Sequence, residues 1–194
     1  NEPFYFSKHI YCEYLTKGGV KVENISKAKA EEIFVEFSDY IFKVAFTLTH
    51  SQFLADDILQ ESFIRIFKNY HTFDESKPVK PWIYKIVLNT FREIKRKQKW
   101  LIFKEHLPES KEADYLKVED QLIKEEVEKE LIVSISKLPN KYKEALVLYY
   151  FEDFTLKEIS EILSIPIGTC KSRIHYAIKK LNKLCKNQLV LNGG

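Results

Sequence analysis

The feature that most constrains the fold is the near absence of glycine. Between Val20 and Asn192 the chain contains a single glycine, Gly168. β-Hairpin turns and phosphate-binding loops depend on glycine, because it adopts backbone angles that other residues avoid. Apolar residues recur instead with the spacing of a helix. The sequence therefore predicts an all-α fold, with helices over residues 28–49, 53–70, 79–99, 117–137, 140–152, 155–163 and 167–186.

A polar break around residues 106–114 interrupts this pattern and contains Pro108, which is typical of a linker. We therefore predict two small helical domains joined by an acidic linker. Residues 1–19 lack helical periodicity, and the chain has no Met. They are interpreted either as a short arm or as a translated leader ahead of a native start near Val20 or Val22. The predicted boundaries are an extension over 1–24, a first domain over 25–100, a linker over 101–124, a second domain over 125–187 and a tail over 188–194.

Charge is unevenly distributed, although the formal net charge is only +3. Residues 77–99 carry a net +7, residues 105–130 a net −6 and residues 157–186 a net +5. Basic segments of this kind suit contact with nucleic-acid phosphates. The acidic segment between them, taken by itself, is interpreted as a solvated coil followed by a charged helix.

Several classes of chemistry find no support in the sequence. The three cysteines, Cys12, Cys170 and Cys185, are far apart and show no metal-ligand spacing. There is no nucleophile–base pair, no nucleotide-binding loop, no signal peptide and no apolar run long enough to span a bilayer. We therefore predict a cytoplasmic protein that is not an enzyme and that has no metal or cofactor.

The strongest local pattern is a helix-turn-helix over residues 155–184. Thr155 is a good helix N-cap, and Glu158 three residues later completes a capping box. A tight turn over residues 164–167 then leads into a longer helix. The apolar face of that helix comprises Ile167, Cys170, Ile174, Ala177, Ile178, Leu181 and Leu184.

The outer face of the same helix is rich in hydrogen-bond donors and positive charge. A helix that reads the major groove needs donors for base edges and cations for phosphates. A solvated basic face is the simpler alternative for an isolated stripe, but the cap and turn favour DNA contact. The predicted DNA-contacting residues are Gly168, Thr169, Lys171, Ser172, Arg173, His175, Tyr176 and Lys179.

Three segments here, Leu138 to Tyr142, Phe154 to Ile159 and Ile165 to His175, resemble the fourth conserved region of extracytoplasmic-function (ECF) sigma factors of the sigma-70 family. That resemblance implies binding of the −35 promoter element. Cys170 stands where the family usually has Val, and its place on the apolar face makes it a core residue.

The first domain resembles the second region of the same family. In helix 53–70, Leu59, Phe63, Ile66 and Phe67 form the predicted buried stripe. The run Leu54 to Glu61 matches the family, which implies that its acidic and Gln residues bind the clamp helices of the largest polymerase subunit. An aliphatic side chain among carboxylates also suggests a protein contact. The predicted polymerase-binding residues are Asp57, Gln60, Glu61 and Ile64.

The run Trp82 to Ile86 followed by Asn89 resembles the family's −10-binding element. The resemblance implies that this helix and the preceding loop open promoter DNA and hold a flipped base. Trp82 itself is interpreted as a core residue. Helical spacing places Ile83, Ile86, Val87, Thr90 and Ile94 inward, and Lys85, Asn89, Arg92, Arg96 and Lys99 outward. The predicted −10 contacts are Lys85, Asn89, Arg92, Arg96 and Phe73.

Together these motifs predict a promoter-recognition subunit of bacterial RNA polymerase. The implied partners are core polymerase (the clamp helices of the largest subunit and the flap of the second-largest), promoter DNA and an anti-sigma factor, which is often membrane-linked. No insertion of the chain itself into a membrane is expected. Two alternatives stay open at this point: a stand-alone helix-turn-helix regulator and a helical nuclease.

Overall fold

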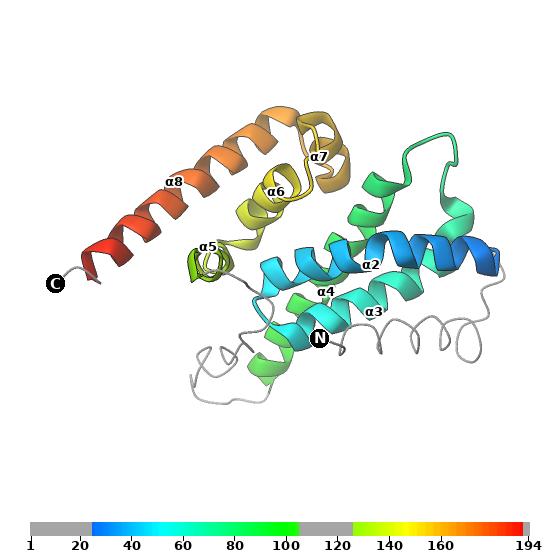
Figure 1. Cartoon of the computed structure of the whole chain (residues 1–194), viewed down its shortest axis with the longest axis horizontal. Coiled ribbons are helices and arrows are strands. Elements are labelled where there is room, and N and C mark those ends of the chain that lie inside the picture. The colour runs from blue at the N-terminus through cyan, green and yellow to red at the C-terminus, as the bar shows by residue number, and fades with distance from the viewer. Residues whose placement is uncertain (1–24, 105–125, 192–194) are drawn as a thin grey trace.

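The computed structural model describes residues 25–104 and 126–191 (Figure 1). Within these ranges the secondary structure is helical and no strand occurs, so the all-α prediction is confirmed. The elements are α2 (Lys27–Thr49), α3 (Gln52–Asn69), the 3₁₀ turn η1 (Tyr70–Thr72), α4 (Val79–Lys104), α5 (Glu126–Ser136), α6 (Asn140–Tyr150), α7 (Leu156–Leu163) and α8 (Ile167–Leu191).

Some of the predicted helix ends differ from those in the structure. α4 continues past the predicted residue 99 to Lys104, since neither Gly nor Pro occurs between Pro81 and Pro108. α8 continues past 186 to Leu191. α6 stops earlier than predicted, at Tyr150, ahead of Asp153 with its left-handed φ of 55°.

Some predictions fall outside the described residues. These are the extension over 1–24, most of the acidic linker and the segment 117–125 of the helix predicted over 117–137.

The N-terminal half is a three-helix unit in which α2 and α4 pack against α3. The predicted stripe on α3 is buried: Leu59, Phe63, Ile66 and Phe67 are each at most 7% exposed. The Phe63 ring lies 4.7 Å from that of Phe34 on α2. Apolar burial between these helices is the main favourable term that fixes their positions.

The C-terminal half joins α6, α7 and α8. The predicted capping box is present: Thr155 Oγ1 accepts from Glu158 N at 3.3 Å, and Thr155 N donates to Glu158 Oε2 at 2.8 Å. Cys170 is fully buried as predicted, and burial raises the pKa of its thiol. Ile167 was predicted on the same face but is 44% exposed; it is the first residue of α8, and burial on this face begins at Cys170.

The two halves contact each other, which the sequence did not predict. α4 packs against α7, and α2 packs against α5 and α6. Tyr84, Leu88 and Phe91 on the second face of α4 are consequently buried, and the Tyr84 ring lies edge-on to Phe154 at 5.2 Å. α4 is therefore buried on two sides rather than one.

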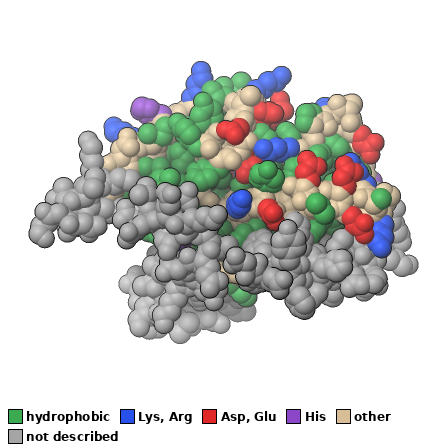
Figure 2. Space-filling view, in the orientation of Figure 1, with side chains coloured by type: hydrophobic (Ala, Val, Ile, Leu, Met, Phe, Trp, Pro, Cys, Tyr) green, Lys and Arg blue, Asp and Glu red, His purple; other side chains and the backbone are tan. Residues whose placement is uncertain are grey.

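The contact between the halves also changes which face of α6 is covered. Tyr149 is 38% exposed, whereas Lys143 and Glu144 are buried. The reason is that α6 lies between α8 and the N-terminal half, so two of its faces are covered. In the space-filling view, side chains of both charges are interspersed over α2, while hydrophobic side chains gather over the C-terminal helices (Figure 2).

Candidate nucleic-acid and protein interfaces

The outer face of α8 presents most of the predicted DNA-contacting side chains. Lys171, Ser172, His175 and Lys179 are exposed, and Thr169 and Arg173 are half-buried. Ser172 Oγ donates to Thr169 O at 3.0 Å, so this hydroxyl lies close to its own helix. The structure thus brings these residues together along one accessible surface.

Gly168 lies exposed in the first turn of α8. A Cβ at this position would meet no atom within 4 Å, and the residue does not have a positive φ. The fold alone therefore does not require glycine here. The open space fits the predicted close approach of backbone amides to a phosphate.

Tyr176 has a partner that the sequence did not reveal. Its ring stacks on Tyr142 of α6, with centroids 4.1 Å apart and planes 27° apart, while 43% of Tyr176 stays exposed. Lys141 Nζ lies 4.9 Å from the Tyr142 centroid. This stacking fixes the Tyr176 ring at the edge of the α8 surface, since offset aromatic pairs are favourable.

On α4, three of the predicted −10 residues are exposed: Lys85, Asn89 and Arg96. Arg92 was predicted to point outward, and this is wrong. Its Nε and Nη2 donate to the two oxygens of Glu144 on α6, at 3.0 and 2.6 Å. Its Nη1 donates to Asn89 Oδ1 at 3.2 Å. The reason is the packing of the C-terminal half onto α4, which supplies a carboxylate that a single-helix pattern cannot reveal.

The Arg92–Glu144 pair is bidentate, and its carboxylate is shielded from water. The Glu144 side chain is 4% exposed and that of Arg92 is 37% exposed. The hydrogen bonds that Arg92 donates to the Glu144 carboxylate raise the pKa of Arg92, because the carboxylate favours the charged guanidinium.

A second polar contact joins the halves at Glu152. Tyr84 Oη donates to Glu152 Oε2, and Lys80 Nζ donates to Glu152 O at 2.9 Å and lies 3.4 Å from Oε2. The Glu152 side chain is 4% exposed, and burial raises the pKa of its carboxyl. Burial likewise raises the pKa of Tyr84.

A third contact is made by Lys143 of α6. Its Nζ donates to Leu48 O of α2 at 2.8 Å and to Ser136 O of α5 at 2.9 Å. Burial lowers the pKa of Lys143 to about 8. We call the residues of these three contacts (Lys80, Tyr84, Arg92, Lys143, Glu144 and Glu152) the interdomain clasp.

Three aromatic rings cluster around the loop before α4: Tyr70 of η1, Phe73 of the loop and Trp82 of α4. The Phe73 centroid lies 5.3 Å from Trp82 and 5.8 Å from Tyr70. Trp82 is half-buried and packs against the core, which agrees with its interpretation as a structural residue. Phe73 is half-buried beside it, so the cluster offers partly exposed ring surface close to the N-terminus of α4.

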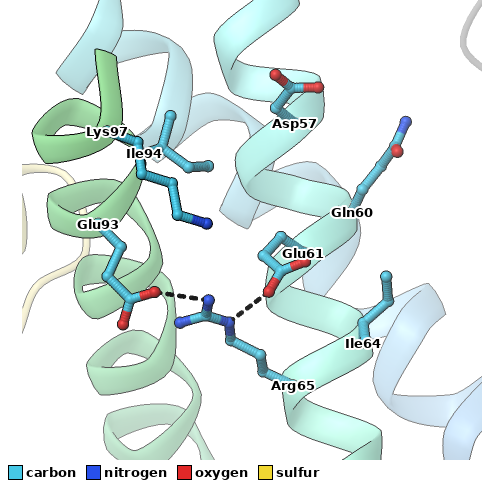
Figure 3. A pocket seen from close by; sticks show the side chains of 8 residues that line it. All are labelled: Asp57, Gln60, Glu61, Ile64, Arg65, Glu93, Ile94 and Lys97. Atoms are coloured by element: carbon cyan, nitrogen blue, oxygen red, sulfur yellow. Dashed lines mark hydrogen bonds and ion pairs between the residues drawn. The ribbon is translucent and has the colours of Figure 1, made fainter. Parts of the chain in front are cut away.

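All four residues predicted to bind polymerase lie in one surface hollow of about 270 Å³ (Figure 3). α3 contributes Asp57, Gln60, Glu61, Ile64 and Arg65, and α4 contributes Glu93, Ile94 and Lys97. The contribution of α4 was not predicted from the sequence. There, the inward face of this helix was assigned to the core and its outward face to DNA, and no face was assigned to a protein partner.

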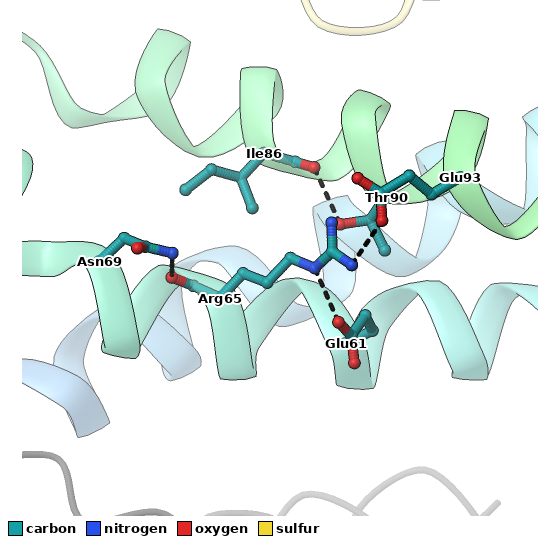
Figure 4. Close-up of polar contacts among 6 residues, drawn as sticks. All are labelled: Glu61, Arg65, Asn69, Ile86, Thr90 and Glu93. Carbon is teal, nitrogen blue, oxygen red and sulfur yellow. Dashed lines mark hydrogen bonds and ion pairs between the residues drawn. The ribbon is translucent and has the colours of Figure 1, made fainter.

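Arg65 joins the two walls of this hollow (Figures 3 and 4). Its Nε donates to Glu61 Oε1 and its Nη2 donates to Glu93 Oε2, each at 2.7 Å. The two carboxylates raise the pKa of Arg65, and the hydrogen bond from Arg65 lowers that of Glu93. Arg65 could have been noticed as a cation four residues after Glu61, but its bond to α4 could not.

Within the described residues, no group of three or more His, Cys, Asp or Glu side chains is arranged to hold a metal ion. Over the same ranges, none of the helices combines the length and apolarity that a bilayer crossing requires.

Two protein-family models match the chain in the order expected from the motifs. Sigma-70 region 2 matches residues 33–101, and Sigma-70, region 4 matches residues 128–181. The chain is 33% identical over 156 residues to the ECF RNA polymerase sigma factor SigW of Bacillus subtilis, covering 76% of this chain and 83% of that protein. It is 32% identical over 161 residues to SigM of the same organism, covering 79% of this chain and 93% of that protein.

Solved structures show the same fold. The sigma factor RpoE of Bartonella quintana, in complex with the anti-sigma factor NepR, superposes with a TM-score of 0.69 at 21% identity, covering 83% of this chain and 98% of that chain. CnrH, in complex with the cytosolic domain of CnrY, superposes with a TM-score of 0.62 at 17% identity, covering 93% of this chain and 98% of that chain.

Proposed function

The chain belongs to the extracytoplasmic-function group of sigma-70 family RNA polymerase sigma factors, and from this premise we propose which of its surfaces serve each step of promoter recognition. The proposal rests on three surfaces that occur in one chain. These are the exposed, donor-rich face of α8, the exposed polar face of α4 and the charged hollow between α3 and α4. Each surface lies within the region of the family to which it corresponds.

α8 reads the −35 element. Its exposed Lys171, Ser172 and His175 lie on the first turns of the second helix of a helix-turn-helix, the part that enters the major groove in such motifs. Lys179 one turn later contacts phosphate, and Tyr176, held by Tyr142, presents its edge beside them. Thr169, Arg173 and Gly168 complete this surface.

α4 reads the −10 element through Lys85, Asn89 and Arg96. The aromatic cluster at Phe73 provides ring surface on which an unstacked base can lie, and such stacking tolerates any base. Arg92 can offer its Nε–Nη2 edge to DNA only after it leaves Glu144, because the carboxylate occupies that edge.

The hollow between α3 and α4 binds core polymerase at the clamp helices, with Asp57, Gln60 and Glu61 as polar contacts and Ile64 as the apolar one. The C-terminal half meets the flap of the second-largest subunit. One neighbour in fold was solved with the anti-sigma factor NepR and another with the cytosolic domain of CnrY, and we assign an anti-sigma partner to the present chain.

The chain itself catalyses no reaction in this proposal, because phosphoryl transfer belongs to the polymerase. It acts in the cytoplasm, where polymerase and DNA are found. The acidic segment 105–130 occupies the RNA exit path until RNA displaces it, and neutralising Glu109, Glu112 and Asp114 tests this through the pattern of abortive transcripts.

The decisive experiment is run-off transcription with purified core polymerase and a promoter library. We expect the chain to redirect initiation to a subset of promoters that share −35 and −10 sequences. Substituting Lys171→Ala and Asn89→Ala should shift the selected bases at the −35 and the −10 positions, respectively. A stand-alone regulator would bind duplex DNA without polymerase and would leave the start sites of core polymerase unchanged, which would defeat the proposal.

A further inference from the structure

We propose that Arg65 is a positioning residue for polymerase binding: it holds Glu61 in place and makes α4, through Glu93, part of the polymerase-binding surface. This inference rests on the proposed function of the hollow. It adds Arg65, which links the proposed contact residue Glu61 on α3 to Glu93 on α4, the helix proposed to read the −10 element.

The geometry of Arg65 differs from that of an ordinary surface ion pair. One guanidinium spans two carboxylates on two helices, and Glu61 and Glu93 are far apart in sequence (Figure 4). The Arg65 side chain is 27% exposed, compared with 42% for Glu61 and 38% for Glu93. The planar fork of arginine suits such a double contact, whereas lysine presents a single point charge.

Each carboxylate keeps an oxygen that Arg65 does not use. Arg65 binds Oε1 of Glu61 and Oε2 of Glu93, which leaves Oε2 of Glu61 and Oε1 of Glu93 outside this contact. A cationic side chain of the partner can bind these oxygens with charge-assisted hydrogen bonds. Because Glu61 is already held by one oxygen, less rotational freedom is lost when the partner binds.

The lining of the hollow fits a partner helix that carries both basic and apolar side chains. The hollow is lined by three carboxylates (Asp57, Glu61 and Glu93), two cations (Arg65 and Lys97) and two aliphatic side chains (Ile64 and Ile94). The close view places Glu93 and Lys97 opposite Glu61 across the hollow (Figure 3). A partner seated there touches both helices, so α4 is positioned by the same surface that binds polymerase.

The test is a double-mutant cycle for the affinity of the full-length chain for core polymerase. Arg65→Ala and Glu61→Gln should each weaken binding by about tenfold, because each removes one side of a charge-assisted contact. The double variant should be little weaker than either single variant, since residues that act through each other are not additive. Arg65→Lys should be intermediate, and Glu93→Gln should weaken binding by about threefold.

A matched cycle uses the exposed Lys29–Glu32 pair of α2, whose Nζ and Oε1 lie 2.8 Å apart. Lys29→Ala and Glu32→Gln should leave polymerase affinity unchanged. Circular dichroism of every variant at the assay temperature separates a loss of fold from a loss of positioning, and Arg65→Lys and Glu93→Gln keep the test decisive if Arg65→Ala unfolds.

Additive effects of Arg65→Ala and Glu61→Gln, or full affinity in folded Arg65→Ala protein, would overturn the positioning role while leaving the proposed polymerase surface intact. Full affinity of Glu61→Gln together with Asp57→Asn would overturn the surface itself, and the positioning role with it.

Discussion

The two sides of α4 are joined to the rest of the molecule by the same kind of contact in two different environments. Toward α3, Arg65 binds Glu61 and Glu93, whose side chains are 42% and 38% exposed. Toward the C-terminal half, Arg92 and Lys80 meet Glu144 and Glu152, whose side chains are each 4% exposed. The carboxylates on the α3 side are therefore solvent-accessible, and those of the clasp are buried.

This difference determines what each contact can do. An exposed pair is screened by water and contributes little to stability, so its carboxylates can be shared with a partner at small expense. A buried carboxylate is costly to leave unpaired, so the clasp either stays whole or opens as a unit. α4 is therefore joined to α3 through carboxylates that remain accessible at the surface, and to the C-terminal half through carboxylates that are buried.

The largest expected effect comes from removing the cation of the clasp. Arg92→Met should lower the free energy of unfolding by about 2–3 kcal/mol, because it leaves the Glu144 carboxylate buried without its partner. Urea unfolding measures this change, and small-angle scattering should show a larger radius of gyration as the halves separate. Arg96→Met, an exposed arginine on the same helix, should change the unfolding free energy by less than about 0.5 kcal/mol. Equal effects of the two substitutions would break the distinction between the buried and exposed sides.

The contacts of the clasp could not be predicted from the sequence, whereas several features within single helices could. Helical spacing correctly gave the α3 stripe at Phe63, the capping box at Thr155 and the buried Cys170, because each depends on residues within one helix or one turn. Helical spacing did not predict the burial of Glu144 and Tyr84, since that burial depends on a neighbour in the other half of the chain.

The candidate surfaces show the same limit. The exposure of Lys85 and Lys171 followed from periodicity. The α4 wall of the hollow and the stacking of Tyr176 on Tyr142 require the tertiary arrangement, which no spacing encodes.

A second prediction concerns the pH dependence of the clasp. Burial lowers the pKa of Lys143 to about 8 from the ordinary 10.5. Between these two values the unfolded chain holds more protons than the folded chain, so this residue makes stability rise with pH in that window. The unfolding free energy of the parent chain should therefore gain about 2 kcal/mol relative to Lys143→Met between pH 7.5 and pH 10. Lys141→Met, an exposed lysine on the same helix, should show no such trend, and a pH-independent difference for Lys143→Met would contradict the burial of its charge.

A third prediction asks whether the clasp restrains DNA binding. Glu144→Gln keeps the shape of the side chain but removes the charge that holds Arg92. The unfolding free energy should fall by about 1 kcal/mol, less than for Arg92→Met, because Arg92 is partly exposed and can turn toward water. Binding of the chain to a fluorescent single-stranded −10 oligonucleotide should strengthen by about threefold, with a steeper salt dependence from the added phosphate contact. Glu31→Gln, at a carboxylate of α2 whose side chain is 45% exposed, is the matched control. Unchanged oligonucleotide affinity in Glu144→Gln would show that Arg92 is not restrained by its partner.

The smallest expected effect lies on the wet side of α4. Glu93→Gln removes one of the two carboxylates that Arg65 binds, yet Glu61 remains 2.7 Å from Arg65 Nε. Because the pair is substantially exposed, the unfolding free energy should change by no more than about 0.5 kcal/mol. That change should disappear in 0.5 M salt, where the Debye length is well below 10 Å, whereas the effect of Arg92→Met should persist because its pair is buried. Urea unfolding of both variants at low and high salt makes the comparison directly. A loss of unfolding free energy in Glu93→Gln that persists at high salt would mean that the Arg65 contact behaves like the buried contacts of the clasp. Polymerase would then have to bind a rigid contact between α3 and α4 rather than a hydrated one.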